Sequence, residues 1–456
     1  MDDPDLLVIG GGAGGISAAQ AAARQGATVL LVQDGPIGGD CTFTGCVPSK
    51  ALLAAAASGA GFAEAMARVR CAVTTIAGNE DDDAMAAQGI SVRHARARFK
   101  APGVVDVDGI SVRAPRTIVA TGAGPFLPPT PGLDTLEVLT NETLFQLDHQ
   151  PASLAVLGGG PMGVEMAQAF ARLGTAVTLI EAEDRVLPGE EAAASAIVGR
   201  ALSADGVDLR VTERLAKAEA TPAGARLHLA SGAIVEAERV LVAIGRSPTS
   251  RGFGLEDIGV ALDGHGFVQT DAALRTNVAG IWAVGDVTGR LQFTHAAARM
   301  GLIAADNALS PLARVRPKRF STAAIPWVTF TDPEVAHVGM TEAEAADHGG
   351  RVATVPFDAF DRAIASGGAD GYFTLIAGPR RVLGNAGGGR LLGATAVGPC
   401  AGELVHEVAL GIQTGMFAGR LAQTVHAYPS WSVAVQIAAA QLFFNIDGRG
   451  HRPARG

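Results

Sequence analysis

The sequence has few cysteines, few aromatic residues and no excess of positive charge. Among its 456 residues are four cysteines, two tyrosines and three tryptophans, and the formal net charge is −9. Four cysteines are too few for the disulfide framework of a small secreted protein. The acidic balance argues against nucleic acid as a partner, because phosphate binding requires a basic surface. With 48% hydrophobic and 18% charged residues, the chain can bury a large core, and its length suits about three domains of ~150 residues.

Long uninterrupted apolar runs are also absent. The Ala-rich stretch 51–67 is interrupted by Ser58 and Glu64, so we interpret it as a buried helix; a membrane span needs about 18 apolar residues in succession. The first residues are acidic and lead directly into an apolar strand, which is unlike a signal peptide. We therefore expect a cytoplasmic protein without a membrane partner.

An internal repeat is the most informative feature of the sequence. The segment LLVIGGGAGGISAAQAAARQGATVLLVQ begins at Leu6 and LAVLGGGPMGVEMAQAFARLGTAVTLIE begins at Leu154, so the two align without a gap at an offset of 148 residues. Each segment has the pattern of an apolar strand, a glycine-rich turn, an Ala-rich helix and a second apolar strand. This order predicts two βαβ units, and the crossover makes each sheet parallel.

Both turns contain the pattern G-x-G-x-x-G, which is typical of dinucleotide-binding folds. One glycine permits the tight turn, one lets the backbone approach a pyrophosphate, and one lets the helix pack on the strand. The pyrophosphate then lies at the helix N-terminus, where unpaired N–H groups favour an anion. A single copy is weak evidence, because a structural glycine-rich turn can have the same pattern, whereas two copies in the same context favour two dinucleotide sites. The glycines are Gly10, Gly12 and Gly15 in the first copy and Gly158, Gly160 and Gly163 in the second.

The residue that ends the second strand of each unit predicts which nucleotide binds. In the second unit this residue is Glu181, whose carboxylate accepts a hydrogen bond from a ribose 2′-hydroxyl and repels a 2′-phosphate. This half is therefore expected to prefer NAD(H) over NADP(H). The first unit has Gln33 instead, whose amide oxygen can accept one hydrogen bond, with Asp34 beside it. The alternative interpretation of Gln33 is a solvated strand end.

Two cysteines follow the first unit in the segment GGDCTFTGCVPSK, which spans residues 38–50. Cys41 and Cys46 lie where an Ala- and Leu-rich helix pattern begins, and a helix N-terminus favours the thiolate. Zinc binding is disfavoured, because Asp40 is the only other ligand type in the segment. From the segment alone, two buried structural thiols remain an alternative.

The segment resembles the redox-disulfide signature of the pyridine nucleotide–disulfide oxidoreductases, and further motifs extend the resemblance along nearly the whole chain. DRAI and AGEL are most similar to the mercuric reductase-like branch. In order, the motifs are TIVATGAGPFLPPTPGL, ERVLVAIGRSP, TNVAGIWAVGDVTG, QFTHAAARMG, IPWVTFTDPEVAHVGMTEAEA, DRAI at Asp361–Ile364 and AGEL at Ala401–Leu404.

The resemblance implies a flavoprotein that binds FAD and NAD(H). In such enzymes NADH reduces the flavin on one face, and the flavin opens the disulfide on the other. Cys46 would face the isoalloxazine and Cys41 would attack the substrate, which requires a thiolate. Lys50 would lie near flavin N5 and pair with Glu165, since buried charges need partners. The alternative for Lys50 is an exposed lysine on the helix surface.

The resemblance also assigns nucleotide contacts. The residues expected to contact one or the other cofactor are Gly10, Gly12, Gly14, Gly15, Gln33, Gly39, Lys50, Ala97, Thr121, Gly122, Asp286, Gly158, Gly160, Gly163, Glu181 and Gly245.

The sequence departs from the family near its C-terminus. Disulfide reductases of this family have a His-Pro-Thr segment whose histidine is the acid–base group, and a glutamate five residues later orients it. Here the corresponding residues are Tyr428 and Val433. Tyr428 is a poor base at neutral pH. His426 lies two residues earlier, so in an extended segment both side chains would point to one side, toward the site of the partner subunit. We name both as catalytic candidates; the alternative for His426 is a surface or interface residue.

These departures narrow the expected activity. Glutathione and lipoamide are disfavoured as substrates, and the C-terminus lacks the vicinal cysteines of dedicated mercuric reductases. Cys400 stands alone and is interpreted as a small buried residue. The leading hypothesis is NADH-dependent reduction of a small disulfide, polysulfide or metal–thiol species through Cys41 and Cys46. The alternatives are an NADH:quinone or dye reductase with non-essential cysteines, and a non-enzymatic dinucleotide-binding subunit.

The expected architecture is α/β, with two Rossmann-like domains and an α+β dimerisation domain. Residues 1–147 and 264–320 are predicted to form the FAD domain, 148–263 the NAD domain and 321–456 the C-terminal interface domain, after the linker RVRPKRF. The resemblance implies a homodimer in which the thiol pair of one subunit meets the C-terminal segment of the other.

Overall fold

The computed structural model describes residues 3–368 and 370–456. It contains two compact units, each of which gathers separate stretches of the chain. The first unit comprises residues up to 154 together with 217–227 and 236–320, and the second comprises 155–216, 228–235 and 321–456.

A five-stranded parallel sheet in the order β17-β7-β1-β2-β3 forms the centre of the first unit. The central strand β1 is completely buried, as expected for a strand covered on both faces. All four strand pairs are parallel, so the first predicted βαβ unit is confirmed. The strands are β1 (Leu6–Ile9), β2 (Val29–Gln33), β3 (Ile90–His94), β7 (Thr117–Val119) and β17 (Ile281–Ala283).

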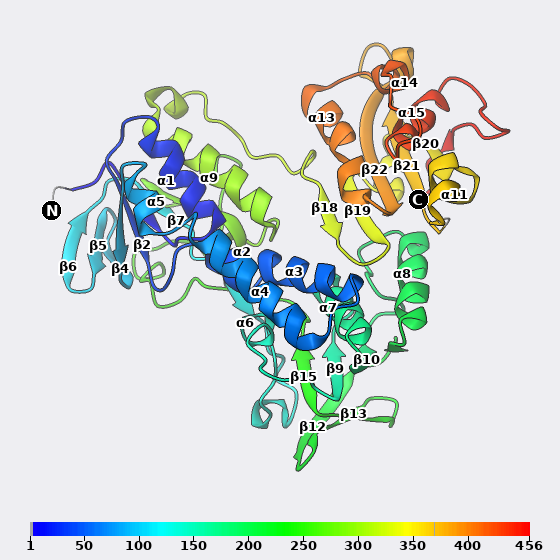
Figure 1. The fold of residues 1–456 in the computed structure, drawn as a ribbon. Coiled ribbons are helices and arrows are strands. Elements are labelled where there is room, and N and C mark those ends of the chain that lie inside the picture. The colour runs from blue at the N-terminus through cyan, green and yellow to red at the C-terminus, as the bar shows by residue number, and fades with distance from the viewer. Residues whose placement is uncertain (1–2, 369) are drawn as a thin grey trace. The chain divides into compact units, whose positions relative to one another are not determined.

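Helices α1 (Ala13–Ala23) and α9 (Thr294–Leu309) lie side by side in this unit (Figure 1). Their small residues make the contact possible: a Cβ at Gly301 would lie 2.2 Å from the carbonyl oxygen of Gly14. The Ala-rich composition of both helices therefore serves close packing. The unit also contains α2 (Gly39–Phe43), α5 (Asp82–Ala86) and α6 (Asn141–Leu144).

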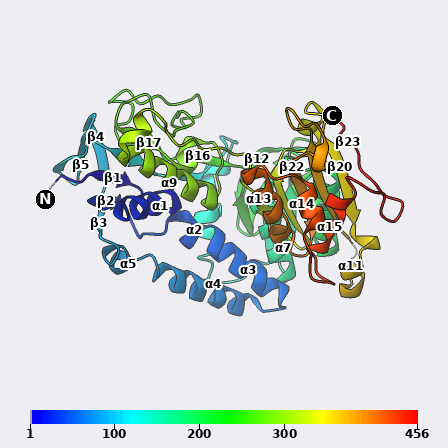
Figure 2. The ribbon, with the colours of Figure 1, turned by 90° about the horizontal axis from the view of Figure 1, so that it is seen from above.

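The Ala-rich stretch 51–67 forms parts of two helices, so the prediction of a single buried helix is wrong. Helix α3 (Cys46–Ala57) ends before Gly59, which has a φ of +75°, and α4 (Phe62–Ala77) begins after Gly61. The two helices run alongside each other (Figure 2). A left-handed glycine is a common helix stop, and in this stretch it outweighs the helix propensity of the alanines.

Antiparallel pairs complete the first unit. Strands β4 (Ala97–Ala101), β5 (Val104–Val107) and β6 (Ile110–Arg113) form one small sheet. Strands β8 (Ala123–Pro125) and β16 (Arg246–Pro248) pair with each other, so the Ala-Thr-Gly segment and the Gly-Arg-Ser-Pro segment meet although they are more than a hundred residues apart. Along the chain, four further strands follow the second repeat and precede the Gly-Arg-Ser-Pro segment: β12 (Leu215–Thr221), β13 (Gly224–Leu229), β14 (Ile234–Ala237) and β15 (Arg239–Val242). They divide between the two units.

The second unit contains most of the second βαβ repeat. Strand β9 (Ser153–Leu157) leads through a glycine turn to α7 (Pro161–Arg172), whose first residue is a proline, a favoured helix start. Strand β10 (Ala176–Ile180) follows and pairs in parallel with β11 (Asp208–Arg210) after α8 (Ala192–Ala204). The second predicted βαβ order is therefore also present.

The second unit also contains an antiparallel sheet in the order β18-β19-β22-β21-β20-β23. Helices α12 to α15 pack against it, and the apolar side chains between them form one core. The strands are β18 (Trp327–Thr329), β19 (Glu334–Gly339), β20 (Arg351–Pro356), β21 (Tyr372–Gly378), β22 (Arg390–Gly398) and β23 (Arg452–Pro453). The helices are α10 (Glu342–Ala346), α11 (Asp361–Ser366), α12 (Ala401–Leu404), α13 (His406–Thr414), α14 (Gly419–Gln423) and α15 (Val433–Ala440).

Two findings concern residues outside these cores. Cys400 is exposed and has a φ of +57° immediately before α12, so the prediction that it is a small buried residue is wrong. Its position at a tight helix entry explains the exposure.

Among the helices of residues 3–368 and 370–456, none is both long and apolar enough to span a membrane.

Two adjacent glutamates are partly buried where the loop before α8 meets the antiparallel sheet. Trp327 Nε1 donates to Glu190 Oε1 at 2.7 Å, and Tyr372 and Thr395 donate to the carboxylate of Glu191, each at 3.3 Å. Burial is the main cause that raises the pKa of both glutamates above the usual 4.5. Both side chains are thus ionised at neutral pH only at a cost to the folded state.

We predict that Glu190→Gln stabilises the protein at alkaline pH. A raised carboxyl pKa means that the folded state binds the proton more tightly, so stability is lost as pH rises from 4.5 through the raised pKa. Glutamine keeps an acceptor for Trp327 without the charge. The thermal midpoint of the variant should exceed that of the parent at pH 8, and the difference should close toward pH 4.5. Glu137→Gln, at an exposed ion pair with Arg239, is the control and should show little change. A difference that does not depend on pH would contradict the prediction.

Candidate active site

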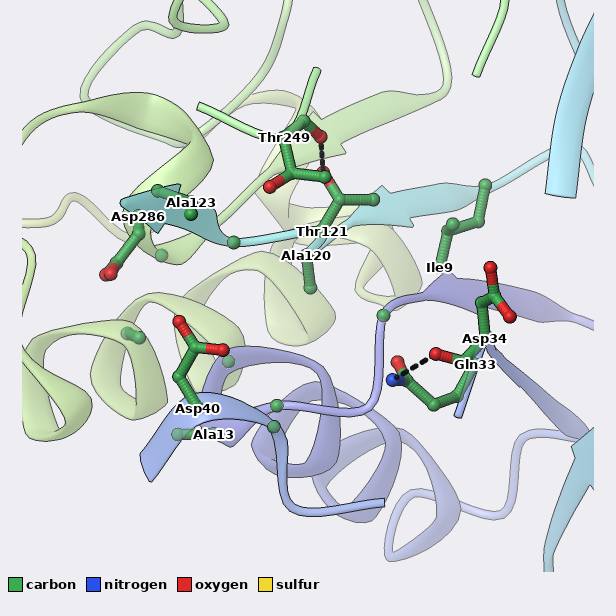
Figure 3. Close-up of a pocket in the computed structure, with 18 of the residues that line it drawn as sticks. Ile9, Ala13, Gln33, Asp34, Asp40, Ala120, Thr121, Ala123, Thr249 and Asp286 are labelled. Carbon is green, nitrogen blue, oxygen red and sulfur yellow. Dashed lines mark hydrogen bonds between the residues drawn. The ribbon is translucent and has the colours of Figure 1, made fainter. Parts of the chain in front are cut away.

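A cavity of about 570 Å³ opens at the carboxyl ends of the parallel strands in the first unit (Figure 3). Ile9 at the end of β1, Gln33 at the end of β2 and Ala120 after β7 line it together with the loop that follows β17. Ligands of open parallel sheets bind at this edge. The cavity is therefore placed where the repeat predicts the first nucleotide.

The glycine-rich turn forms the floor of the cavity. Gly10 has a φ of +108°, and a Cβ there would lie 2.3 Å from the carbonyl oxygen of Ala120. Gly39 has a φ of +63°, and its Cβ would lie 2.8 Å from the Cα of Gly12. Two backbones thus meet where side chains would fill the space, beside the N-terminus of α1. Bare backbone at a helix N-terminus suits a pyrophosphate.

Gln33 closes this turn. Its Oε1 accepts a hydrogen bond from the backbone N–H of Gly11 at 2.6 Å. Its Nε2 donates to the carbonyl oxygen of Asp34 (Figure 3). The structure therefore engages Gln33 in the turn, unlike a solvated strand end. The Asp34 carboxylate is 2.7 Å from Arg96 Nε, and both residues line the cavity.

An arginine not identified as a site residue from the sequence connects two acids in the cavity wall. Arg246 forms ion pairs with Asp40 and Asp286, and it also donates to the carbonyl oxygen of Ala123. Burial raises the pKa of Asp286 to about 6, although Arg246 opposes the rise. The sequence signal for Arg246 was its position directly after Gly245, where the chain returns to the first unit.

Nearby, Thr121 Oγ1 donates to the carbonyl oxygen of Thr249 at 2.6 Å (Figure 3). This bond ties together the two segments that pair through β8 and β16. Both threonines line the cavity, so the segments form one wall of it.

A buried polar atom in the cavity lining tests whether FAD fits. Among the described residues, Gln292 Nε2 is buried without a hydrogen bond, and its side chain lines the cavity. A buried donor without a hydrogen bond is costly, and a ligand rich in oxygen atoms supplies acceptors. The backbone floor, the acids and this donor together fit a flavin dinucleotide.

The two cysteines lie at the same cavity. Cys41 is in α2 and Cys46 is the first residue of α3, and both are thiols in the structure. Their hydrogen bond, followed by burial, raises the pKa of Cys41 strongly. Cys46 Sγ is also 3.3 Å from the hydroxyl of Thr294 at the start of α9. Cys46 therefore lies beside the Thr294 hydroxyl, the Cys41 thiol and the N-terminus of α3.

The second glycine-rich turn repeats the construction of the first. Glu181 is buried; its Oε2 accepts from the N–H of Gly159 at 2.5 Å and its Oε1 from the N–H of Glu183 at 2.7 Å. Gly158 has a φ of +105°, Gly160 precedes α7, and Gly163 packs against the Gly158 carbonyl as Gly15 packs against that of Gly10. The side chain that ends the second strand holds the turn in both repeats.

The remaining predicted residues lie in different parts of the fold. Gly12, Gly14, Ala97, Gly122 and the other cavity residues lie together, whereas Gly245 is beside the wall, where its carbonyl accepts from the N–H of Phe126. Lys50 is partly buried on α3. Glu165 is buried on α7, and its carboxylate accepts from the N–H of Phe330 at 2.9 Å. The pairing of Lys50 with Glu165 stays a prediction.

The two C-terminal candidates lie in different environments, so the expectation that their side chains share one direction is wrong. The His426 side chain is only 5% exposed and forms an ion pair with Glu407 at 3.1 Å. Tyr428 is 74% exposed and donates to Asp361 Oδ2 at 2.8 Å. The two side chains bind carboxylates on different helices, Glu407 on α13 and Asp361 on α11, and are therefore held apart.

Two Rossmann-type nucleotide folds combined with an adjacent thiol pair define a dithiol flavoprotein oxidoreductase. Family models agree: residues 4–301 match the pyridine nucleotide-disulphide oxidoreductase model, and residues 325–439 match the dimerisation domain of the same family. The chain belongs to the pyridine nucleotide-disulphide oxidoreductase family, as the motifs predicted, and it is a flavoprotein that uses FAD and NAD(P)H.

Individual relatives have different activities. A dihydrolipoyl dehydrogenase of Thermus scotoductus is 34% identical, with 97% of this chain and 98% of the relative covered. A mercuric reductase of Streptomyces lividans is also 34% identical, with 95% of each covered. Among solved structures, the Cu(II) complex of the HOCl-induced flavoprotein disulfide reductase RclA from Escherichia coli is 28% identical with a TM-score of 0.87, covering 96% of this chain and 99% of that one.

We predict that Gly10→Ala prevents flavin binding. A Cβ at this position clashes with the Ala120 carbonyl and requires a strained φ, so the cavity floor must shift. The purified variant should contain less than about a tenth of the flavin of the parent, measured by absorbance after denaturation. The control is Gly61→Ala, where φ is −73° and a Cβ meets nothing within 4 Å; it should retain its flavin. Full flavin content in Gly10→Ala would exclude the assigned floor.

Proposed function

We propose that the chain uses NADH to reduce a small disulfide, polysulfide or metal–thiol species through a redox-active Cys41–Cys46 pair. The observation that carries the proposal is the position of both thiols on the wall of the cavity that fits FAD, in hydrogen-bond contact with each other. The bound flavin supplies the transfer of electrons between the nicotinamide and the sulfur pair. The residues of the chain hold the flavin and position the two thiols.

The surroundings of the two thiols assign them different tasks. Cys46 lies at the N-terminus of α3, next to Thr294 and the Cys41 thiol. All three stabilise negative charge on sulfur. Cys41 is partly buried and Cys46 is exposed, so exposure does not separate their tasks. The helix N-terminus and the Thr294 hydroxyl beside Cys46 support Cys46 as the sulfur that faces the cofactor. The family resemblance gives Cys41 as the sulfur that meets the substrate.

The family's dimerisation domain supports a homodimer. In the proposed assembly, the segment containing Tyr428 approaches the thiol pair of the partner subunit. Because Tyr428 replaces the family's histidine and Val433 its glutamate, substrates that depend on that pair are disfavoured. A location in the cytoplasm stays a prediction, and so do the boundaries of the three domains.

A flavin-level NADH:quinone or dye reductase remains the second candidate. The replacement of the acid–base pair favours it, because electron transfer from a flavin to a quinone needs no thiol. The two candidates differ in whether turnover passes through Cys46.

We predict that Cys46→Ser lowers turnover of the thiol-level substrate by at least about 10³-fold, since a hydroxyl cannot replace the redox sulfur. Steady-state NADH oxidation would be measured with inorganic polysulfide and, separately, with a quinone. Quinone reduction should persist in the variant. Cys71→Ser, an exposed cysteine on α4 that does not line the cavity, should retain both activities. If Cys46→Ser reduces polysulfide at the parental rate, the second candidate is favoured.

We further predict that Glu181→Gln weakens the preference for NADH. Gln33 already makes the equivalent bond to the first turn, so glutamine should preserve the second turn while removing the charge that repels a 2′-phosphate. The ratio of kcat/KM for NADH to that for NADPH should fall about tenfold. Gln33→Glu, which affects only the first repeat, is the matched control and should leave the ratio unchanged. An unaltered ratio in Glu181→Gln would show that specificity resides elsewhere.

A further inference from the structure

The segment that carries Tyr428 is firmly attached to α11. The Trp431 ring packs against Phe357 and Phe360, with ring centroids 5.3 and 6.1 Å apart, and the Arg362 guanidinium lies 5.9 Å from the same ring. These contacts hold the segment beside Asp361, the first residue of α11. The hydrogen bond between Tyr428 and Asp361 is therefore part of a packed arrangement and not an isolated surface contact.

The hydroxyl proton of Tyr428 is engaged in a hydrogen bond to Asp361. The hydroxyl donates to the carboxylate at 2.8 Å, and this bond is the main cause that raises the pKa of Tyr428 above 10. A phenol with a raised pKa that already donates to a carboxylate is a poor acid toward anything else. Toward any other group, the exposed hydroxyl therefore acts as a hydrogen-bond acceptor.

The other side-chain donors of residues 424–430 are also engaged. His426 Nδ1 faces the Thr424 carbonyl oxygen at 2.9 Å, and Nε2 faces the Glu407 carboxylate. Thr424 Oγ1 donates to the Arg420 carbonyl oxygen. Ser430 Oγ is 3.0 Å from Ser432 Oγ. Every imidazole N–H and hydroxyl of this stretch thus has an oxygen partner within the chain.

We infer that Asp361 is a positioning residue that removes proton donation from the segment, so that the enzyme selects acceptors whose leaving sulfur departs as a stable anion. This inference rests on the proposed function and on the homodimer. In thiol–disulfide exchange, the Cys41 thiolate forms a bond to one sulfur while the bond to the second sulfur breaks, and the electron pair leaves with the second sulfur. A weakly basic thiolate or polysulfide anion leaves without a proton, whereas an alkyl thiolate leaves slowly unless an acid protonates it. The favoured class is therefore polysulfides and disulfides of acidic thiols.

The first experiment tests the Tyr428–Asp361 pair without reference to activity. The chain has two tyrosines. The other, Tyr372, is partly buried, and burial strongly raises its pKa. In a Tyr372→Phe background, ultraviolet absorbance therefore follows the tyrosinate of Tyr428 alone. Asp361→Asn should lower its pKa back toward 10, and Asp361→Glu should largely restore the parental titration. An unchanged titration in Asp361→Asn would overturn the positioning role.

The second experiment tests selectivity with two probes in the FAD-containing enzyme. 5,5′-Dithiobis(2-nitrobenzoate) releases a stable thiolate, and 2-hydroxyethyl disulfide releases an alkyl thiolate. In Asp361→Asn, the hydroxyl of Tyr428 becomes available to donate, so kcat/KM for the alkyl disulfide should rise about tenfold relative to the aromatic one. The gain should disappear in Asp361→Asn combined with Tyr428→Phe.

The outcomes separate the inference from the function on which it rests. If the titration shifts but the relative kcat/KM of the two probes does not, the inference about selectivity is wrong while the thiol-level function stands. If neither probe requires Cys46, the proposed function fails, and the titration still decides whether Asp361 positions Tyr428. A parental enzyme that already prefers the alkyl disulfide would also contradict the inference.

Discussion

The bond between a strand-end side chain and the backbone N–H of the glycine turn is the interaction on which the shape of both glycine-rich turns depends. Gln33 makes it to Gly11 and Glu181 makes it to Gly159, at nearly the same distance. The glycines of the turn have no side chains that could stabilise its shape. A Cβ at Gly10 would collide with the carbonyl oxygen of Ala120, which follows β7. Its shape is therefore fixed from outside by an acceptor on the neighbouring strand. That acceptor leaves the helix N-terminus bare for a phosphate, and it can be neutral or charged without altering the turn.

The position of the thiol pair depends on this turn, because α2 begins at Gly39, where the chain passes close to the glycine-rich turn. Helix α3 follows directly. Gly39 approaches the Cα of Gly12, and two residues later Cys41 enters the cavity wall. The same close approach brings Cys46 to Thr294 at the start of α9, which itself packs on α1 through glycine contacts. The position of the sulfurs is thus determined by backbone contacts between small residues. Larger residues at these positions would separate the cofactor floor from the redox pair.

Local patterns predicted the features that depend on local physics. The repeat identified both βαβ units, and the glycine spacing identified the cavity floor, because strand, turn and helix are set by neighbouring residues. The ion pair of Arg246 with Asp40 joins residues 206 positions apart. It depends, like the ion pair with Asp286, on how β8 and β16 pair, which no local pattern encodes. The single helix predicted for residues 51–67 failed because helix propensity was weighed without the left-handed Gly59. Glu407 and Asp361, the partners of His426 and Tyr428, were missed for the same long-range reason.

The replacement of a histidine by Tyr428 changes the chemistry of the segment only together with Asp361. A tyrosine alone could donate its proton to a leaving group, weakly but usefully. With a carboxylate 2.8 Å away, donation outward would require breaking a charge-assisted bond. His426 is close in sequence but holds Glu407 with its side chain almost entirely covered, so it does not compensate. Under the proposed function, the acid–base role of the family's histidine is therefore not transferred to a neighbouring residue. We propose that two carboxylates suppress it, and that the cysteine pair acts on acceptors that need electrons but no proton.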